Sequence, residues 1–312
     1  MTTVGIDIGG SKVEAVLLEG TNVVMSERSA TGFDDDLSTR VTQAVKSVIG
    51  EDTEAVGVGV AGLVRWPEGA FAWGPHLPGA DIALRTELEA AFGLPVVVDS
   101  DANTAAFGEL RAGAGRGYSN FLLVTLGTGI GGAIVIGGDV YRGESFAGEW
   151  GHMLYDAHGM LCDCGKRGCW ETVASGPGLV RLARESITIN PDSSLAKRLG
   201  AVFSGEDISA AADAGDEVAR GLVAQVGAQF GKGLCSLIAI FDPEAIIVGG
   251  GLGSVGESLV GPARRVVADA LHGGSHRLVP PILVAGLGPQ AGAIGAGMMA
   301  DAVARREIML DS

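Results

Sequence analysis

Basic residues are scarce in this 312-residue chain. It has 22 Lys and Arg against 37 Asp and Glu, so its net charge is −15. Proteins that bind nucleic acid usually present a basic patch, and nucleic acid is therefore a poor candidate partner. An acidic chain that binds a polyphosphate must use backbone amides, helix N-termini and a metal ion. The 51 glycines could supply such backbone, although a general preference for Gly and Ala would explain the number equally well.

Long apolar runs are also missing. No segment approaches the 18 consecutive apolar residues expected of a membrane-spanning helix. The first apolar run is interrupted by Asp7 and no basic leader precedes it, so no signal peptide is visible. With 47% apolar and 19% charged residues the composition is that of a soluble protein. We expect a cytoplasmic protein of two domains that has no membrane partner.

Cysteine occurs only four times, and three of the four fall in one stretch behind a histidine: His152, Cys162, Cys164 and Cys169. Four such ligands at short spacings suit tetrahedral zinc, and a site without an open position is structural. Gly165 and Gly168 would let the backbone turn tightly enough to bring the thiols together. The alternatives are three buried cysteines, or one disulfide with a thiol left over. Thiols around a metal, with Cys235 alone in an apolar helix, also fit a reducing compartment.

Two glycine-rich turns each join a pair of predicted strands. Strands 4–8 and 13–18 flank D-I-G-G-S-K, and strands 121–125 and 133–136 flank L-G-T-G-I-G-G. Such turns gather free N–H groups at one point, as a phosphate site requires. One turn is weak evidence, whereas a matched pair, one per domain, is what an actin-like ATPase needs. The G-K-[ST] ending of a Walker A loop is missing from both.

Polar residues follow the predicted strand 96–98 directly, as Asp99, Ser100, Asp101 and, after one alanine, Asn103. Active sites of open α/β sheets lie beyond the carboxyl ends of their strands, so this group suits proton transfer. Helix capping is the alternative, because Ser, Asp and Asn are preferred N-caps. We expect one of them to cap the next helix and the others to be free for chemistry.

The order of elements predicts a two-domain α/β fold. After three strands, an amphipathic helix over 37–48, a strand at 56–60, a helix over 81–92 and the strand 96–98 give the order β-β-β-α-β-α-β-α. This order resembles the ribonuclease H-like fold of sugar kinases, actin and related ATPases. Helices at about 173–186, 207–214, 216–240, 255–271 and 291–305, with strands at 245–248 and 282–284, complete the prediction.

The cysteine stretch carries a family resemblance. E-W-G-H, from Glu149 to His152, is followed by C-D-C-G-K-R-G-C-W-E, from Cys162 to Glu171. These motifs resemble the signature of the ROK family (repressors, open reading frames, kinases), whose enzymes phosphorylate hexoses. The resemblance covers essentially the whole chain and implies an actin/hexokinase-type fold with a zinc knuckle. We expect a small domain of residues 1–112 plus the C-terminal helix 291–312, and a large domain of residues 113–290.

The resemblance also implies roles for individual residues. The family pattern E-N-D-A-N makes Asp101 the catalytic base, and D-x-G-G-[TS]-K is the first phosphate loop, with Asp7 near the nucleotide's magnesium. Sugar-binding residues are expected at Gly62, Ser100, Asp101, Glu149, His152 and Glu171. Nucleotide-binding residues are expected at Asp7, Gly9, Gly10, Ser11, Lys12, Gly127, Thr128, Gly129, Gly249, Gly250 and Gly251. A zinc-bound His152 would have a second ring nitrogen free for a sugar hydroxyl.

The resemblance implies ATP-dependent phosphorylation of a hexose at its C6 hydroxyl, with glucose favoured and with ATP, Mg²⁺ and a structural Zn²⁺ as cofactors. N-acetylglucosamine, N-acetylmannosamine and fructose are alternative acceptors. A sugar-sensing transcriptional regulator is a further alternative, but its helix-turn-helix would precede the element that begins here at residue 7. A non-catalytic sugar-binding relative is disfavoured by Asp101. The expected partners are the hexose, ATP and further copies of the chain, in a dimer or tetramer.

Three positions depart from the family pattern. Ser100 stands where Asn is usual, Pro75-His76 where P-N is usual, and Ala61-Gly62 where P-G is usual. A hydroxyl is shorter than a carboxamide and offers one donor in place of two. Either a water fills the gap or the sugar is bound differently, for example by His76. The alternative is that His76 is a surface loop residue.

Overall fold

The structure, a computed structural model, describes residues 1–10, 12–30, 36–200, 202–253 and 255–310. Its contacts divide the chain into two compact units, which are described separately below. Unit 1 comprises Met1–Leu123, Ala133–Gly148 and Ala285–Ser312, and unit 2 comprises Val124–Gly132 and Glu149–Val284. The domain limits expected from the sequence, 112/113 and 290/291, stay a prediction.

The first sheet belongs to unit 1 and has the strand order β3-β2-β1-β4-β7. The strands are β1 (Thr2–Ile8), β2 (Lys12–Glu19), β3 (Asn22–Ala30), β4 (Thr53–Val60) and β7 (Val96–Ser100). Helices α1 (Leu37–Val48) and α2 (Leu84–Phe92) come between them in the chain, and α3 (Asp101–Ala112) follows β7. Strands β1 and β2 are antiparallel, whereas β1 with β4 and β4 with β7 are parallel. The predicted antiparallel pair around the first glycine turn is therefore confirmed.

Two local differences from the sequence prediction arise between β4 and α2. A short hairpin of β5 (Leu63–Arg65) and β6 (Ala70–Trp73) was not predicted. Helix α2 begins at Leu84 and not near residue 81, because Ile82 still pairs with Phe71 by two backbone hydrogen bonds of 2.9 Å. Local apolar periodicity could not reveal this pairing, since it joins residues on either side of a long turn.

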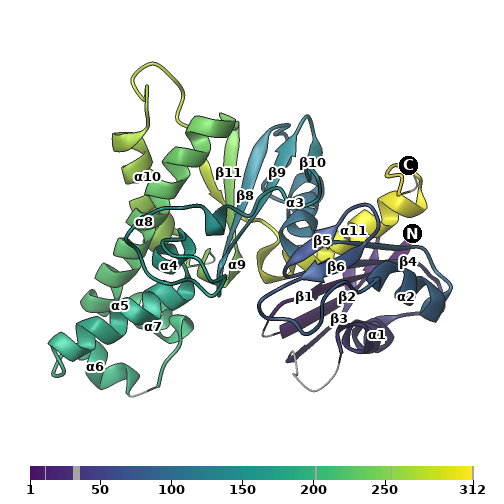
Figure 1. Ribbon diagram of the computed structural model, residues 1–312, viewed down its shortest axis with the longest axis horizontal. Helices are drawn as coiled ribbons and strands as arrows, with labels where there is room; N and C mark the ends of the chain where they lie inside the picture. The colour runs from purple at the N-terminus through teal and green to yellow at the C-terminus, as the bar shows by residue number, and fades with distance from the viewer. Residues whose placement is uncertain (11, 31–35, 201, 254, 311–312) are drawn as a thin grey trace. The chain divides into compact units, whose positions relative to one another are not determined.

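Helix α11 (Ala291–Ala304) completes unit 1 and packs on β1, β4 and α3 (Figure 1). Glycine makes this contact possible. A Cβ on Gly57 of β4 would overlap the carbonyl of Ala296, and one on Gly295 of the helix would overlap the carbonyl of Thr104 in α3. The backbones therefore touch where side chains would normally separate them. The last helix of the chain thus packs on strands from its N-terminal part.

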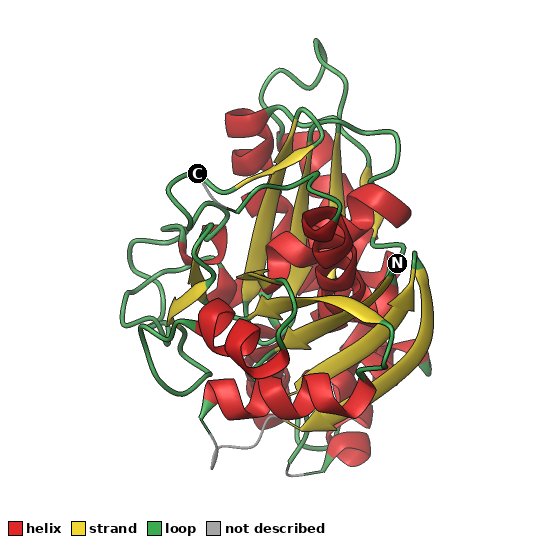
Figure 2. Cartoon of the chain, turned by 90° about the vertical axis from the view of Figure 1, so that its right-hand side faces the viewer, coloured by secondary structure: helices red, strands yellow, loops and turns green. Residues whose placement is uncertain are grey.

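The second sheet repeats the plan of the first, with the strand order β10-β9-β8-β11-β12. Its strands are β8 (Phe121–Leu126), β9 (Ile130–Ile136), β10 (Asp139–Tyr141), β11 (Ala245–Gly249) and β12 (Ile282–Val284). In each sheet the first three strands along the chain occupy the third, second and first places, and two later strands extend the other side. Figure 2 draws the strands in yellow and the helices in red. The predicted repetition of strand, glycine turn and strand is confirmed as a repetition of sheet topology.

Helices make up most of the remainder of unit 2. They are α4 (Glu171–Ala174), α5 (Gly176–Ile189), α6 (Ser194–Leu199), α7 (Gly205–Asp213), α8 (Glu217–Phe241), α9 (Gly250–Gly253) and α10 (Glu257–Ala270). Among the described residues, α8 alone is long and apolar enough to span a membrane by length and composition, and half of that stretch is buried in the protein. It lies beside α10 (Figure 1), with Gly227 and Gly231 against the backbone of Leu259 and Ala263. These contacts are those of a core helix.

The close approach of α11 predicts a specific sensitivity to small side chains. We expect Gly295→Ala to lower the free energy of unfolding by about 1–3 kcal/mol, because the added methyl group overlaps the Thr104 carbonyl. Gly221→Ala is the matched control, since Gly221 is exposed in α8 and nothing lies within 4 Å of the place its methyl group would take. That variant should gain about 0.5–1 kcal/mol from helix propensity. Equilibrium urea unfolding followed by circular dichroism measures both, and equal effects in the two variants would contradict the packing argument.

Candidate active site and metal centre

Three neighbouring parallel strands of unit 1 end at one edge of its sheet. Gly9 and Gly10 follow β1, Gly62 follows β4, and Asp101 follows β7. The ends of β1 and β4 are tied together, since the Ala61 N–H donates to the Ile8 carbonyl at 3.0 Å. Residues predicted from separate motifs therefore meet where open α/β sheets bind their ligands.

Helix α3 begins at the predicted base. The Asp101 carboxylate accepts a hydrogen bond from the Ala102 N–H at 2.8 Å and is partly buried. Ser100 is the N-cap, because its hydroxyl accepts from the Asn103 N–H at 3.2 Å. The expectation that one polar group caps this helix is thus confirmed for Ser100. The cap uses an oxygen lone pair and leaves the hydroxyl proton available to another acceptor.

Asp99 is buried, and both of its carboxylate oxygens are used. One oxygen accepts from the Ser100 N–H and from the Asn103 side-chain amide, each at 2.8 Å. The other accepts from Nε of Arg142 at 2.7 Å. The sequence placed Asp99 among the candidates for proton transfer, but both of its oxygens are occupied by hydrogen bonds that hold the neighbouring residues in place. Arg142 was missed, because nothing in the sequence pairs positions 43 residues apart.

Asp7 lies near the end of β1, partly buried against the first turn of α11. A Cβ on Gly292 would lie 2.6 Å from its Oδ2 atom, so only glycine leaves room for the carboxylate. Burial raises the pKa of Asp7 to about 6, Lys12 lowers it and Glu14 raises it again. The Gly9 N–H donates to the Lys12 carbonyl at 2.9 Å, which closes the first glycine turn. Ser11, also predicted to contact the nucleotide, lies outside the described residues.

His76 lies beside the first glycine turn. A Cβ added to Gly10 would be 2.5 Å from the His76 Cβ, and the His76 side chain is exposed. Gly10, His76 and the neighbouring Pro75, Leu77 and Pro78 line a hollow of about 310 Å³. The P-H departure from the family pattern is therefore located at the predicted phosphate turn.

The second glycine turn, Gly127–Gly129, is the meeting point of the predicted nucleotide segments in unit 2. The Gly176 N–H, in the first turn of α5, donates to the Gly127 carbonyl at 2.8 Å. Gly250 packs on Leu126 with a φ of +80°, a conformation and a closeness that require glycine. Thr128 is exposed beside them. The segment Gly249–Gly251 and the capped N-terminus of α5 thus adjoin the turn, and such helix ends favour phosphate groups.

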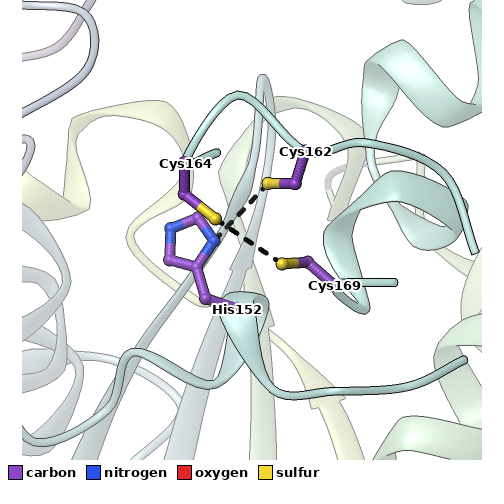
Figure 3. Close-up of side chains that lie close together, drawn as sticks. All are labelled: His152, Cys162, Cys164 and Cys169. Carbon is purple, nitrogen blue, oxygen red and sulfur yellow. Dashed lines mark hydrogen bonds between the residues drawn. The ribbon is translucent and has the colours of Figure 1, made fainter. Parts of the chain in front are cut away.

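The four predicted zinc ligands form one cluster in unit 2 (Figure 3). Their ligand atoms all lie within 4.8 Å of one another: His152, Cys162, Cys164 and Cys169. Nδ1 of His152 is 3.7 Å from the Cys162 sulfur, and the Cys164 and Cys169 sulfurs are 3.6 Å apart. Ligands around a tetrahedral zinc ion are about 3.5–3.8 Å apart, given Zn–S and Zn–N bonds of about 2.3 and 2.0 Å. The donor set and its spacing therefore fit zinc, and the four cysteines of the chain are all free thiols.

Backbone hydrogen bonds and one tryptophan hold this knuckle in place. The Cys162 N–H donates to the Lys166 carbonyl at 2.7 Å, and the Gly165 N–H donates to the Cys162 carbonyl at 2.9 Å. Gly165 has a φ of +84°, as the predicted tight turn requires. Next to the last ligand, Trp170 is fully buried and stacks on Phe230 with ring centres 5.5 Å apart. The knuckle is thereby anchored on helix α8.

Two acids flank the cluster, and one of them reaches the second glycine turn. Glu171 Oε1 accepts from the Cys162 thiol at 2.9 Å and lies 3.4 Å from His152 Nδ1. Its other oxygen accepts from the Ile130 N–H at 3.3 Å. Glu149 keeps an exposed surface, yet burial raises its pKa, His152 lowers it and Glu171 raises it. The three residues of unit 2 that were predicted to bind sugar, Glu149, His152 and Glu171, therefore lie close together.

Comparisons with known proteins agree with this geometry. The sequence profile of the ROK family matches residues 3–303. The chain belongs to the ROK family. It is 38% identical over 307 residues to a glucokinase from Streptomyces coelicolor, covering 96% of this chain and 97% of that protein. It is 29% identical over 311 residues to the xylose repressor of Bacillus subtilis, covering 94% of this chain and 75% of that protein.

Solved structures show that the fold is that of ROK sugar kinases. A ROK family glucokinase from Streptomyces griseus, in complex with glucose and AMPPNP, aligns with a TM-score of 0.90 at 38% identity. That alignment covers 96% of this chain and 99% of the other. A ROK hexokinase from Thermus thermophilus aligns with a TM-score of 0.74 at 31% identity, covering 98% of this chain and all of that one. The predicted α/β fold of the sugar-kinase type is confirmed.

The raised pKa of Asp7 predicts a pH-dependent stability. The Asp7 carboxyl group has a pKa of about 6 in the folded protein, against 3.8 for the unperturbed group. The folded state therefore binds the proton more tightly than the unfolded state. This contribution to stability is complete below about pH 4 and is lost as the pH rises through 6. We expect Asp7→Asn to be more stable than the wild type at pH 8, by about 1–3 kcal/mol, with the difference vanishing near pH 4.

Urea unfolding in the absence of nucleotide and metal, between pH 4 and pH 8, measures this difference. Asp52→Asn is the control, since Asp52 lies in an exposed turn of the same unit. It should stay within about 0.5 kcal/mol of the wild type throughout. A stability difference for Asp7→Asn that does not change with pH would show that the effect does not come from titration of this carboxyl group.

Proposed function

We propose that this protein is an ATP-dependent hexokinase that transfers the γ-phosphoryl group of MgATP to the C6 hydroxyl of glucose. The observation that carries the proposal is the alignment with glucokinases along 96% of the chain. The presence of Asp101 at the start of α3, beyond the carboxyl end of β7, supports it further. Both a nucleotide analogue and a sugar are present in the Streptomyces griseus glucokinase, as AMPPNP and glucose.

Asp101 is the proposed general base. It would accept the proton of the attacking hydroxyl, and phosphoryl transfer then depends mainly on positioning and charge stabilisation. Its hydrogen bond to the Ala102 N–H orients the carboxylate at the start of α3. Ser100 and Gly62 lie at the same sheet edge and are the proposed sugar contacts from unit 1. Because Ser100 caps α3 with its oxygen, we propose that it donates its hydroxyl proton to the sugar.

The phosphates of ATP are assigned to backbone amides. In unit 1 we assign them to the turn that Gly9 closes, to Gly10 and the adjoining Ser11 and Lys12. In unit 2 we assign them to the turn that Gly127 closes, to Thr128 and Gly129, and to the segment Gly249–Gly251. Mg²⁺, when bound, would offset phosphate charge, and Asp7 is the carboxylate proposed to lie near it. Since burial raises the pKa of Asp7, a cation nearby would also stabilise its ionised form. An acidic chain with net charge −15 can thus bind a polyanion without a basic patch.

The sugar contacts proposed from unit 2 are Glu149, His152 and Glu171. We propose that zinc is held by Nδ1 of His152 and by three thiolates: those of Cys162, Cys164 and Cys169. With Nδ1 bound to the metal, the Nε2–H group of His152 is left to donate to a sugar hydroxyl. All four protein ligands would be used, so this zinc is structural and takes no part in phosphoryl transfer.

A sugar-responsive repressor is the second candidate, because the chain is also similar to a xylose repressor over 94% of its length. The two candidates differ in turnover. Steady-state kinetics with MgATP and glucose, mannose, fructose, N-acetylglucosamine and N-acetylmannosamine tests them together. We expect glucose to be phosphorylated with the highest kcat/KM. If none of these sugars is phosphorylated, the proposed kinase function is rejected. If the wild type prefers another sugar and Ser100→Asn shifts that preference to glucose, glucose is rejected as the natural acceptor and Ser100 is identified as the cause.

The same assay tests the base. Asp101→Asn should lower kcat for glucose by about 10²–10⁴, the usual effect of losing a general base, while glucose affinity changes little. Asp36→Asn is the matched control: Asp36 also stands at a helix start, where it caps α1, and Asn caps equally well. Calorimetry with glucose measures affinity apart from turnover. Near-normal kcat in Asp101→Asn would overturn the assignment of the base.

Removal of the metal gives an independent prediction. We expect one zinc ion per chain by elemental analysis, and a large loss of thermal stability on chelation, because structural zinc contributes on the order of 10 kcal/mol in small peptides. Glucose binding should weaken as well, since His152 loses its orientation. Cys162→Ser should reproduce both effects, whereas Cys235→Ser, outside the cluster, should reproduce neither. Wild-type protein free of zinc, with fully active Cys162→Ser, would contradict the prediction.

We also propose a homo-oligomer, a dimer or tetramer, located in the cytoplasm. Strand β3 is an edge strand of its sheet, and all nine of its residues are exposed. They include half-exposed Val24 and Met25. A long exposed edge with apolar side chains is a typical site of pairing with another chain, and sedimentation velocity measures the outcome.

A further inference from the structure

Arg142 is held on three sides in unit 1. It follows β10, and its Nε donates to Asp99 at 2.7 Å while its Nη1 donates to the Val140 carbonyl at 3.0 Å. The guanidinium carbon lies 3.7 Å from the centre of a Trp66 ring. The Arg142 side chain is 14% exposed and that of Asp99 is 1% exposed. This arrangement is far more enclosed than the surface ion pairs found elsewhere in the described residues.

Through Asp99, Arg142 is connected to the turn that carries the base. The Asp99 oxygen not bound to Arg142 accepts from the Ser100 N–H and from the Asn103 amide. These two residues lie on either side of Asp101 in the sequence: Ser100 is the last residue of β7, and Asn103 lies in the first turn of α3. The direction of the Asp101 side chain therefore depends on how Asp99 is oriented.

The other side of Arg142 is connected to the segment that leaves β4. Trp66 lies just beyond β5, four residues after Gly62. Three residues after Arg142, Ser145 accepts a hydrogen bond from the Trp66 N–H at 3.1 Å and donates one to its carbonyl at 3.3 Å. The turn 142–145 thus contacts both Trp66 and Asp99. It joins the segments that follow two of the three strand ends at the site.

We propose that Arg142 is a positioning residue for phosphoryl transfer, which fixes Asp101 through Asp99 and the Gly62 segment through Trp66. This inference rests on the proposed kinase function. A buried ion pair adds little net stability compared with an apolar pair, so stability alone does not account for it. A guanidinium group, by contrast, donates in a rigid planar fork and stacks on aromatic rings, which sets geometry. Arg142 acts through its two neighbours and leaves the sugar contacts to Gly62 and Ser100.

Small displacements at this turn should be costly for the reaction. A general base has to come within hydrogen-bonding distance of the proton that it accepts, about 2.6–3.2 Å. A misplacement of about 1 Å can lower the rate about 10²-fold. The binding of ATP should be little affected, because the amides assigned to its phosphates belong to the glycine turns. The inference therefore predicts a fall in kcat with a nearly constant KM for ATP.

The test compares Arg142→Met and Arg142→Lys with the control Arg111→Met in the full-length enzyme. Arg111 is a fair control because it too belongs to unit 1, lies over a ring, Phe107, and pairs with an acid, Glu307. We expect Arg142→Met to lower kcat for glucose about 10–100-fold, with KM for ATP within about 3-fold of wild type. Arg142→Lys should recover part of kcat, since its charge still faces Asp99, and Arg111→Met should match the wild type.

Asp99 left unpaired could unfold the protein, so the double variant Asp99→Asn/Arg142→Met is measured beside the single ones. It removes the buried charge pair and keeps an oxygen for the Ser100 N–H. Circular dichroism gives the folded fraction, and kcat is expressed per folded molecule. A folded double variant with kcat lowered at least 10-fold and KM for ATP unchanged supports the inference. Wild-type kcat per folded molecule in the double variant, or an equal loss in Arg111→Met, overturns it. A wild type that does not phosphorylate glucose rejects the proposed function instead.

Discussion

Helix α11 meets the first sheet backbone to backbone, and this contact fixes where the residues at the sheet edge can lie. Glycine is required at two places: a methyl group on Gly57 in β4 would overlap the Ala296 carbonyl of the helix, and one on Gly295 in the helix would overlap the Thr104 carbonyl of α3. Gly292 of the same helix leaves just enough space for the Asp7 carboxylate. The helix thus determines how closely the elements of the core pack, and its first turn forms part of the surroundings of Asp7. A segment near the C-terminus thereby determines the chemistry of a residue near the N-terminus.

Local sequence signals were sufficient for most of the fold. Short apolar runs such as 56–60 predicted strands, and the two glycine turns predicted the repeated topology. The cluster of one histidine and three cysteines could also be predicted, because C-x-C with a third cysteine and a nearby histidine is a typical spacing of metal-binding donor atoms. In each case the physical cause lies within a few residues of its effect.

Features that depend on distant partners were not predictable. The β5–β6 hairpin and the late start of α2 follow from the pairing of Phe71 with Ile82, which periodicity does not report. The role of Asp99 depends on Arg142, which follows a strand of a different sheet, and a single sequence offers no sign of that pair. Likewise, the contact of Glu171 with the Ile130 N–H links a knuckle to a turn 41 residues away. The structure therefore reveals residues that support the site from distant parts of the chain, which the sequence did not.

The position of α11 in the chain has a consequence for synthesis. Strands β1, β4 and β7 emerge from the ribosome early, but the helix that covers them is encoded only at residues 291–304. At about 5–20 residues per second, roughly 10–40 s pass between the synthesis of the end of α3 and that of α11. During that interval a glycine-lined apolar face of the sheet is bare. Unit 1 can then complete its folding only once residues 291–304 have been synthesised, and its nascent half is a natural client for chaperones.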